Sequence, residues 1–320
     1  MDKKYDVVAL GELLIDFTEN GVSGQGNPIM EANPGGAPCN VLAMLAGLGY
    51  NTAFVGKVGD DMFGRQLKDA ICEVGISPEG LIMDPVIHTT LAFVHTFEDG
   101  DRDFSFYRNP GADMMLSVDD IDAEMISNCR IFHFGSLSMT SEGCFEATKK
   151  AIEIAKSSGA IISYDPNLRE PLWDNLEHAK EKIAYGMSMC DVMKISDNEI
   201  QWFTGVLDYA EGVSAIRKKY PNIKLILVSL GKEGSMAFMG DEIVTANPFI
   251  QKNTIETTGA GDTFCASVLH YILQNGFEDY SANQLTEMIT YANAAASIVT
   301  TRRGALRVMP KDEEVKEILK

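Results

Sequence analysis

Residues 256–267 have the sequence ETTGAGDTFCAS, in which a glycine-rich turn directly precedes a stretch with apolar residues at helical spacing. Small residues let the chain turn tightly and leave its backbone N–H groups open. The first N–H groups of a helix have no partner within the helix, and the helix dipole adds about half a positive charge there. We therefore predict an anion-binding turn at Gly259, Ala260 and Gly261.

Asp262 lies in the same turn. A carboxylate repels a phosphate group, but it can accept the proton of a hydroxyl that attacks that phosphate. This position therefore favours Asp262 as a general base in phosphoryl transfer. A simpler interpretation is that Asp262 only caps the helix and that the glycines form an ordinary tight turn.

A second glycine-rich segment, NPGGAPCN, occupies residues 33–40. Gly35 and Gly36 place backbone amides at the start of a predicted helix, and Asn40 offers a donor and an acceptor in its first turn. Asp16 lies just beyond the first predicted strand. A carboxylate, an amide and open N–H groups suit the neighbouring hydroxyls of a sugar, although a Gly-Gly turn can also be purely structural.

Between these turns, short β-branched runs alternate with longer segments of helical period. Strands are predicted at 7–10, 52–55, 131–134, 160–164, 192–195 and 225–229, and helices at 40–48, 63–74, 142–157, 176–189, 209–219, 261–274, 281–300 and 311–320. Such alternation indicates an α/β protein with a mostly parallel sheet and helices on both faces. We expect residues 1–320 to form a single domain.

Two segments depart from this alternation, because residues 12–32 and 88–108 are strand-like without helices between them. The second contains a hairpin of Thr90–Phe97 and Arg102–Tyr107 around a turn at 98–101. We predict a small β-sheet lid, formed by about residues 12–34 and 88–110 and inserted in the α/β core. The alternative is an edge hairpin of the main sheet.

The composition excludes some classes of partner. The chain has 27 basic and 46 acidic residues and a net charge of −19, so it offers no basic field for nucleic acid or an anionic membrane. Six cysteines without a CxxC pair, no signal peptide and no apolar run of about 18 residues predict a cytoplasmic protein.

Several common motifs are absent from the sequence. It lacks GxxxxGK[ST], GxSxG and HExxH, and no GxGxxG follows the first strand. These absences disfavour a P-loop nucleotide-binding protein, a serine hydrolase and a zinc protease. A nicotinamide-dependent oxidoreductase is likewise poorly supported.

Two separated signatures give the chain a family resemblance. GGAPCNVLAMLAGLG at 35–49, followed by VGKVGDDMFG at 55–64, and ETTGAGDTFCAS at 256–267 resemble the ribokinase-like carbohydrate kinases over nearly the full length. FYRNPGAD at 106–113, DPNLR at 165–169 and KISDNE at 194–199 resemble fructokinases most.

The resemblance implies a ribokinase-like α/β core with a β lid and transfer of the γ-phosphoryl group of ATP to a sugar hydroxyl, with D-fructose giving fructose 6-phosphate. Asp262 would be the base, and Gly259, Ala260 and Gly261 the anion hole. The residues implied to bind sugar are Asp16, Gly35, Gly36 and Asn40, with Arg108 and Arg169 contacting the sugar or the transferring phosphate.

The resemblance also implies nucleotide and metal sites. ATP would lie near Ser229, Gly231, Gly234, Gly261 and Asn293. Glu199 would help to place Mg²⁺ indirectly, although Ser196 stands where the family has asparagine. A K⁺ site would be formed by Glu256, Thr258 and the carbonyl groups of Val299, Arg302 and Gly304, although the family usually has Asp at position 256.

Some alternatives stay open at this point. The acceptor could be 2-keto-3-deoxygluconate, ribose or adenosine, or the chain could be a sugar-binding relative without catalysis. An apolar lid face, predicted from Leu91, Phe93, Phe104 and Phe106, favours a homodimer through the lid.

Overall fold

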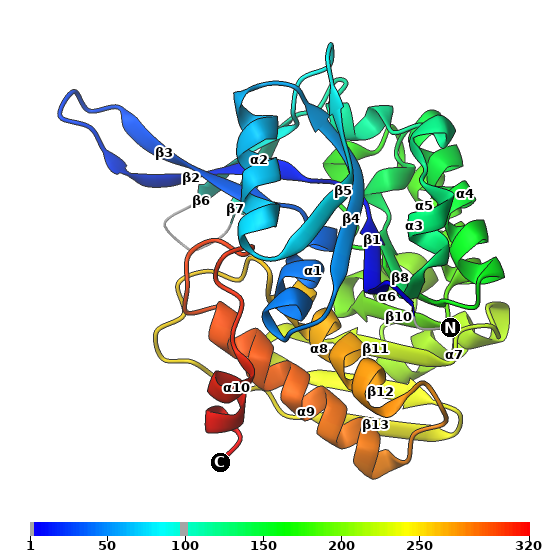
Figure 1. Ribbon diagram of the computed structural model, residues 1–320. Coiled ribbons are helices and arrows are strands. Elements are labelled where there is room, and N and C mark those ends of the chain that lie inside the picture. The colour runs from blue at the N-terminus through cyan, green and yellow to red at the C-terminus, as the bar shows by residue number, and fades with distance from the viewer. Residues whose placement is uncertain (1–2, 97–101) are drawn as a thin grey trace.

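The computed structural model describes residues 3–96 and 102–320, and within them a nine-stranded sheet forms the centre of the molecule (Figure 1). Its strands are β1 (Tyr5–Leu10), β4 (Thr52–Gly59), β5 (Ile76–Asp84), β8 (Cys129–Gly135), β9 (Ile161–Asp165), β10 (Val192–Ser196), β11 (Leu225–Ser229), β12 (Ser235–Met239) and β13 (Glu242–Ala246). Their order is β13-β12-β11-β10-β9-β8-β1-β4-β5. All neighbouring strands from β11 to β5 are parallel. Strand β12 pairs antiparallel with both β11 and β13.

Helices cover both faces of this sheet. One face packs against α1 (Ala37–Gly47), α2 (Met62–Glu73), α8 (Ala260–Asn275), α9 (Ala282–Val299) and α10 (Asp312–Ile318). The other packs against α3 (Ala123–Ser127), α4 (Glu142–Ser157), α5 (Leu176–Met189), α6 (Asp197–Thr204) and α7 (Tyr209–Lys219).

Strand β1 shows why two layers form. Val7 and Ala9 enter one core and Val8 and Leu10 enter the other, because successive side chains of a strand point to opposite faces. All four are fully buried. A strand that is apolar on both faces needs helices on both sides, and the predicted α/β class is therefore confirmed.

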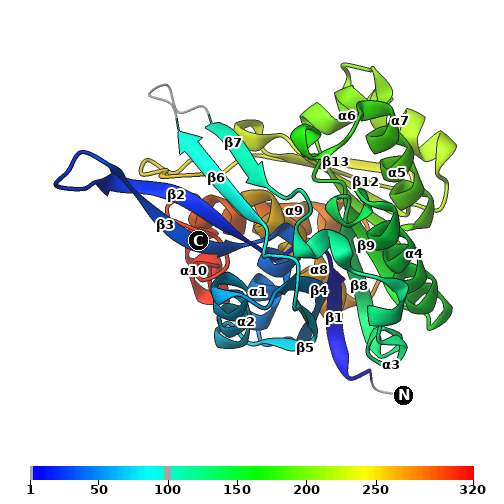
Figure 2. The ribbon, with the colours of Figure 1, turned by 90° about the horizontal axis from the view of Figure 1, so that it is seen from above.

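A separate four-stranded sheet projects from this body (Figure 2). It consists of β2 (Leu14–Val22), β3 (Pro28–Gly35), β6 (Leu91–Thr96) and β7 (Arg102–Tyr107), in the order β3-β2-β6-β7. The alternative of an edge hairpin of the main sheet is therefore wrong. The predicted turn at 98–101 lies outside the described residues, as does Phe97, and the movement of this sheet as a lid stays a prediction.

Strands β5, β12 and β13 and helix α3 were not predicted. The outermost strand, β13, has only Ala246 buried, so its sequence lacks the apolar run that marks the central strands. Short 3₁₀ turns, also unpredicted, lie at η1 (Ala112–Met115), η2 (Val118–Asp120), η3 (Leu137–Met139), η4 (Glu170–Leu172) and η5 (Gly231–Glu233). Within the described ranges, no helix has both the length and the apolar character needed to span a membrane.

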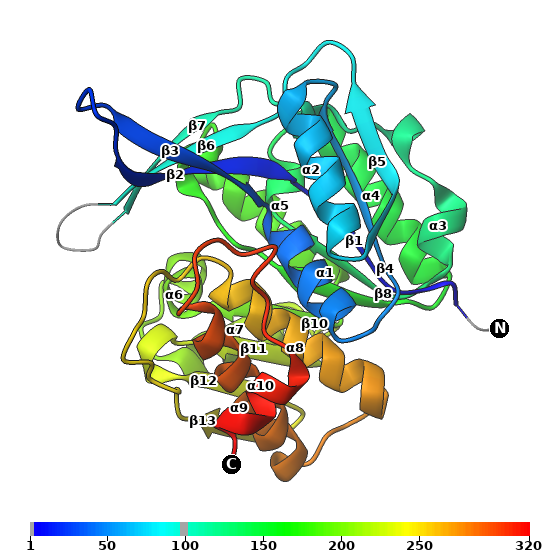
Figure 3. The same ribbon diagram turned by 60° about the vertical axis from the view of Figure 1, so that its left-hand side comes forward.

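The chain directs several polar segments to one edge of the main sheet. Strands β1, β9 and β10 are parallel, so the residues after their carboxyl ends meet there. Helices α1 and α8 pack against each other, and both begin at the same edge (Figure 3). A site at this edge can therefore use strand ends and two helix N-termini together.

Candidate active site

A cavity of about 360 Å³ lies where the second sheet approaches the starts of α1 and α8. The second sheet contributes Thr18 and Val94 to its wall. The two helix starts contribute Gly36, Asn40 and Asp262. Segments more than 200 residues apart in sequence therefore line one cavity.

Asp262 is directed toward Asn40 across this cavity. The Asn40 Nδ2 group donates to Asp262 Oδ2 at 2.7 Å, and Asn40 Oδ1 is buried without a partner. Gly259, with φ of +78°, is the N-cap of α8, and no side chain caps this helix, so the interpretation of Asp262 as its cap is wrong. An unpaired amide oxygen and a nearby carboxylate leave acceptors for a ligand hydroxyl.

Burial raises the pKa of Asp262 above its usual value, while the Asn40 hydrogen bond and the Lys194 charge act in the opposite direction. A carboxylate with a raised pKa is a stronger proton acceptor than an ordinary one when it is ionised. The side chain therefore has the position and the chemistry for a general base.

The Gly35-Gly36 turn fits closely against two acidic residues. A Cβ at Gly35 would lie 2.3 Å from Asp16 Oδ2, and one at Gly36 would lie 2.4 Å from the Glu12 carbonyl oxygen. Gly36 also has φ of +133°, which side chains rarely tolerate. The two glycines therefore let the chain pass directly beside Asp16.

Asp16 itself lines the cavity, and burial raises its pKa to about 7. The Arg169 charge lowers that pKa, whereas Glu256 and Asp262 raise it. The structure thus brings Asp16, Gly36, Asn40 and Asp262 together, with Gly35 directly behind Asp16, as the sequence predicts. Their roles toward a ligand stay predictions.

Glu12 was missed in the sequence. Its Oε1 accepts the Ala37 N–H at 2.8 Å, it is 5% exposed, and it lines the cavity. Burial raises its pKa to about 7. No local pattern in the sequence signals this contact, because Glu12 lies just after a buried strand and 25 residues before Ala37.

Lys194 and Asp165 were missed as a pair. Lys194 Nζ lies 3.0 Å from Asp165 Oδ2, and both residues are at most 7% exposed. A Cβ on Gly261 would lie 3.1 Å from the same Nζ, so the ammonium group sits directly beside the start of α8. A buried cation next to a helix N-terminus favours an anion such as phosphate.

A second cavity of about 310 Å³ adjoins the first. Asn167, Arg169 and Lys194 line both cavities. Asn167 has φ of +45°, the only described non-glycine residue in the positive range. A strained backbone at the junction of two cavities is typical of a functional segment. Arg169 is exposed there, as the prediction of a ligand contact requires.

Arg108 lies in the protein interior. It is 4% exposed and does not line the cavity that contains Asp262. Its Nε donates to Asp113 Oδ2 at 2.7 Å, Nη1 to Thr140 Oγ1 at 2.8 Å and Nη2 to the Leu137 carbonyl at 3.0 Å. In this structure the Arg108 donors have buried protein partners, and the contact of Arg108 with the sugar or the phosphate stays a prediction.

The anion turn differs from its prediction at one residue. Gly259 and Gly261 line the cavity, but Ala260 does not, and Ala260 donates its N–H to the Thr257 carbonyl at 3.2 Å. The Ala260 amide is therefore already engaged within the turn.

The predicted ATP residues lie outside both cavities, except for Gly261. Ser229 ends β11, Gly231 lies in η5, and Gly234 follows it. Asn293 donates to the Ala246 and Asn247 carbonyls at 3.2 and 3.0 Å, so its amide fixes the chain after β13. Contact of these residues with ATP stays a prediction.

The Glu199 carboxylate accepts hydrogen bonds from neighbouring protein groups. Its Oε1 accepts the Leu168 N–H at 2.7 Å, and its Oε2 accepts the Ser196 N–H and hydroxyl, both at 2.8 Å. It thereby ties the start of α6 to the loop after β9 and borders the second cavity. Both oxygens are engaged, which fits an indirect role toward a metal.

The residues predicted for a monovalent cation lie close together. Glu256 Oε1 accepts the Gly304 N–H at 2.8 Å, and Arg302 donates its N–H to the Val299 carbonyl at 3.1 Å. Glu256, Thr258 and Gly304 line the first cavity. Among the described residues, no group of three or more His, Cys, Asp or Glu side chains could hold a metal ion.

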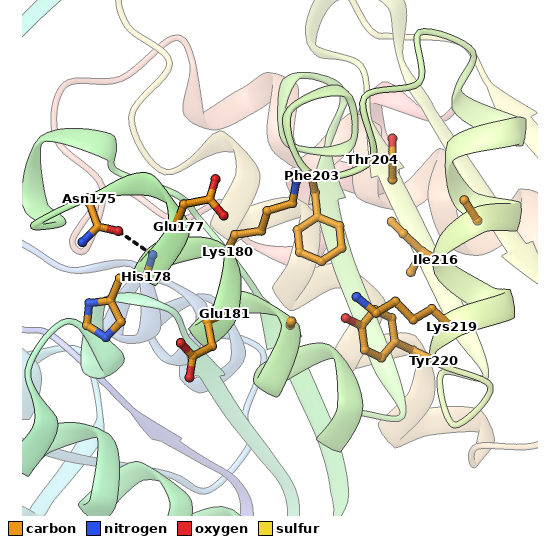
Figure 4. Close-up of a pocket in the computed structure, with 12 residues that line it drawn as sticks. Asn175, Glu177, His178, Lys180, Glu181, Phe203, Thr204, Ile216, Lys219 and Tyr220 are labelled. Carbon is orange, nitrogen blue, oxygen red and sulfur yellow. Dashed lines mark hydrogen bonds between the residues drawn. The ribbon is translucent and has the colours of Figure 1, made fainter.

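A larger cavity of about 690 Å³ lies elsewhere, between α5, α6 and α7 (Figure 4). Phe203, Ile216 and Tyr220 form its apolar part, while Lys180 and Lys219 border the Phe203 ring. None of the predicted site residues lines it. The reactive groups therefore converge in the smaller cavity.

Comparison with known proteins agrees with this arrangement. A model of the pfkB family of carbohydrate kinases matches residues 4–312. The chain is 41% identical to fructokinase-1 of Zea mays over 98% of this chain and 97% of that protein.

Solved structures give the same result. The fructokinase of Xylella fastidiosa with bound ATP has a TM-score of 0.89 and 30% identity, with 98% of each chain covered. A fructokinase double mutant of Vibrio cholerae O395, in its fructose, ADP and potassium ion bound form, has a TM-score of 0.86 and 28% identity, with 100% of each chain covered.

Proposed function

The chain belongs to the pfkB family of carbohydrate kinases, and from this premise we propose that it transfers the γ-phosphoryl group of ATP to D-fructose, forming fructose 6-phosphate. The observation that carries the proposal is the pairing of Asn40 with Asp262 inside a cavity that Asp16 also lines. A base, a hydroxyl-binding carboxylate and two helix N-termini meet in a space of sugar size.

The sugar is held first by the groups around Asp16. The Asp16 carboxylate and the free Asn40 Oδ1 accept hydrogen bonds from sugar hydroxyl groups. Asp262 accepts the proton of the hydroxyl that attacks the γ-phosphorus, as the bond between that phosphorus and ADP breaks. Enclosure of the cavity by the second sheet keeps water from competing as the acceptor.

The transferring phosphoryl group lies beside Lys194 and the Gly259–Gly261 turn. The Lys194 ammonium group stabilises the charge that develops on the phosphoryl oxygens, and Arg169 borders the same space. Asp165 keeps Lys194 in place through their 3.0 Å ion pair. The second cavity then accommodates the rest of the triphosphate, toward Ser229, Gly231, Gly234 and Asn293.

Mg²⁺ would be held mainly by ATP and water, and when bound it neutralises phosphate charge. Glu199 acts at one remove, because both of its oxygens already accept hydrogen bonds from Leu168 and Ser196. K⁺ would be held beside Glu256, Thr258 and Gly304, with the carbonyl groups of Val299 and Arg302. Its charge would strengthen the anion-binding turn nearby.

We further propose a homodimer through the second sheet and a cytoplasmic location. The sheet exposes the apolar side chains of Val22, Ile29 and Tyr107, which supports contact with a second copy. Phe104, one residue of the predicted apolar face, has a side chain outside the described set. All six cysteines are free, which suits a reducing compartment.

The test is an ADP-coupled assay over fructose, ribose, 2-keto-3-deoxygluconate and adenosine, each with and without K⁺. We expect fructose to give the highest kcat/KM and K⁺ to increase it. Turnover of another acceptor at a higher kcat/KM would replace fructose as the substrate. Fructose binding without ATP turnover would instead identify a non-catalytic sugar-binding protein.

A further inference from the structure

Two strands of the second sheet, β6 and β7, are joined to the body at one small polar cluster. Thr90 directly precedes β6, and Arg108 directly follows β7. Asp113, in η1, lies between them: Thr90 Oγ1 donates to Asp113 Oδ1 at 2.5 Å, and Arg108 Nε and Nη2 each lie 2.7 Å from Asp113 Oδ2. We call Thr90, Arg108 and Asp113 the base clamp.

The base clamp is shielded from water, which makes its contacts strong. Thr90, Arg108 and Asp113 are 1%, 4% and 5% exposed. A charge-assisted hydrogen bond in such a place contributes more than one in water, and an unpaired partner costs more. The two strands are therefore fixed relative to η1 at the point where they enter and leave the sheet.

The base clamp also reaches the wall of the sugar cavity. Arg108 Nη2 donates to the Leu137 carbonyl at 3.0 Å, and Leu137 lines that cavity. On the other side, the Thr90 carbonyl accepts the Ile15 N–H at 3.2 Å, next to Asp16. One cluster thus connects β6, β7, the Leu137 wall and the strand that carries Asp16.

Gly111 shows how closely the cluster is packed. A Cβ there would lie 1.8 Å from Thr90 Oγ1, 2.7 Å from Asp113 Oδ1 and 3.0 Å from Arg108 Cγ. Gly111 has φ of −93°, an ordinary backbone conformation, so a methyl group would disturb the cluster by contact alone.

We propose that the base clamp positions the second sheet by fixing β6 and β7 over the cavity. This position controls how often the phosphoryl group is transferred to the sugar and how often it is transferred to water. The inference rests on the proposed sugar kinase function. Arg108 acts here through its hydrogen bonds to Asp113 and to the Leu137 carbonyl. In the competing reaction water attacks the γ-phosphorus, the bond to ADP breaks, and ADP, inorganic phosphate and a proton are released.

The experiment measures the ratio of inorganic phosphate to sugar phosphate, together with the fructose KM, for Gly111→Ala and Thr90→Val. Because both products come from the same folded molecules, loss of folded protein does not change their ratio. We expect each variant to raise the ratio and the fructose KM by about tenfold, the effect of one charge-assisted hydrogen bond, and to leave the ATP KM nearly unchanged. Thr90→Ser keeps the hydroxyl and should restore the ratio.

Gly143→Ala is the matched control, since a Cβ there meets no atom within 4 Å and the residue lies in α4, away from the second sheet. Wild-type ratio and fructose KM in Thr90→Val would overturn the inference, whether or not Gly111→Ala folds. A wild-type chain that forms no sugar phosphate would refute the proposed function itself, so the two failures are distinguishable.

Discussion

Asp16 is a half-buried carboxyl group in the first strand of the second sheet, and it lines the same cavity as Asp262. Burial raises its pKa to about 7, so near neutral pH it carries a proton in part of the ligand-free molecules. The ionised form accepts hydrogen bonds from hydroxyl groups more strongly than the protonated form does. Sugar binding should therefore depend on pH close to neutrality.

We expect the Kd for fructose, measured by calorimetry without ATP, to rise as the pH falls from 8 to 6. Below a pKa of about 7 the ionised fraction of Asp16 decreases about tenfold per pH unit, and affinity decreases with it. Glu12→Gln removes the other carboxyl group of similar pKa and should keep this dependence. A Kd that is constant over this range would contradict the assignment of Asp16 as the hydroxyl acceptor.

The sequence predicted some site residues and not others for a physical reason. Gly36, Asn40 and Asp262 lie in short motifs at helix starts, where local sequence decides the geometry. Lys194 was missed because its place in the site depends on contacts with Asp165 on a neighbouring strand and with Gly261 on α8. The ion pair of Arg108 with Asp113, five residues later in the chain, was also not predicted.

At the level of elements, the start of α1 depends on Gly36. We expect Gly36→Ala to lower the free energy of unfolding by about 1–3 kcal/mol or more, because the residue has φ of +133° and its Cβ would lie 2.4 Å from the Glu12 carbonyl. Urea denaturation measures this change.

Gly47→Ala, at the other end of the same helix, is the control. Its Cβ meets nothing within 4 Å, so the free energy of unfolding should stay the same or rise by about 0.5–1 kcal/mol. Equal stability of the Gly36 and Gly47 variants would show that the turn tolerates a side chain.

Helix prediction succeeded where the apolar period was long. The helices at 142–157, 176–189 and 209–219 begin and end as predicted. The strands of the second sheet could be recognised as strands, but their order β3-β2-β6-β7 could not, since β2 pairs with β6 across about 70 residues of intervening chain. Long-range pairing of this kind has no local signal.

At the scale of the whole molecule, buried carboxyl groups link stability to pH. Glu12 and Asp16 keep protons up to about pH 7 in the folded chain, whereas an unfolded chain releases them near pH 4. The unfolded state therefore binds fewer protons in this interval, and stability falls as the pH rises. His133, whose pKa burial lowers to about 3, acts in the opposite direction, but only below about pH 6.5, where an unfolded histidine is charged.

Between about pH 6.5 and 8 we therefore expect the free energy of unfolding to fall by an amount on the order of 1 kcal/mol through these two groups. Urea denaturation at several pH values measures this trend, and Glu12→Gln should reduce it by about half. A free energy that rises across the interval would mean that the carboxyl groups are ionised in the folded chain well below pH 7.

The central claim is that one carboxylate, Asp262, removes the proton of the sugar hydroxyl while the phosphoryl group passes to it. The most direct measurement is the kcat of Asp262→Asn, together with its Kd for fructose by calorimetry. We expect kcat to fall by about 10²–10⁴-fold, the range for loss of a general base, while the Kd changes only a few-fold. A variant with near wild-type kcat would contradict the account.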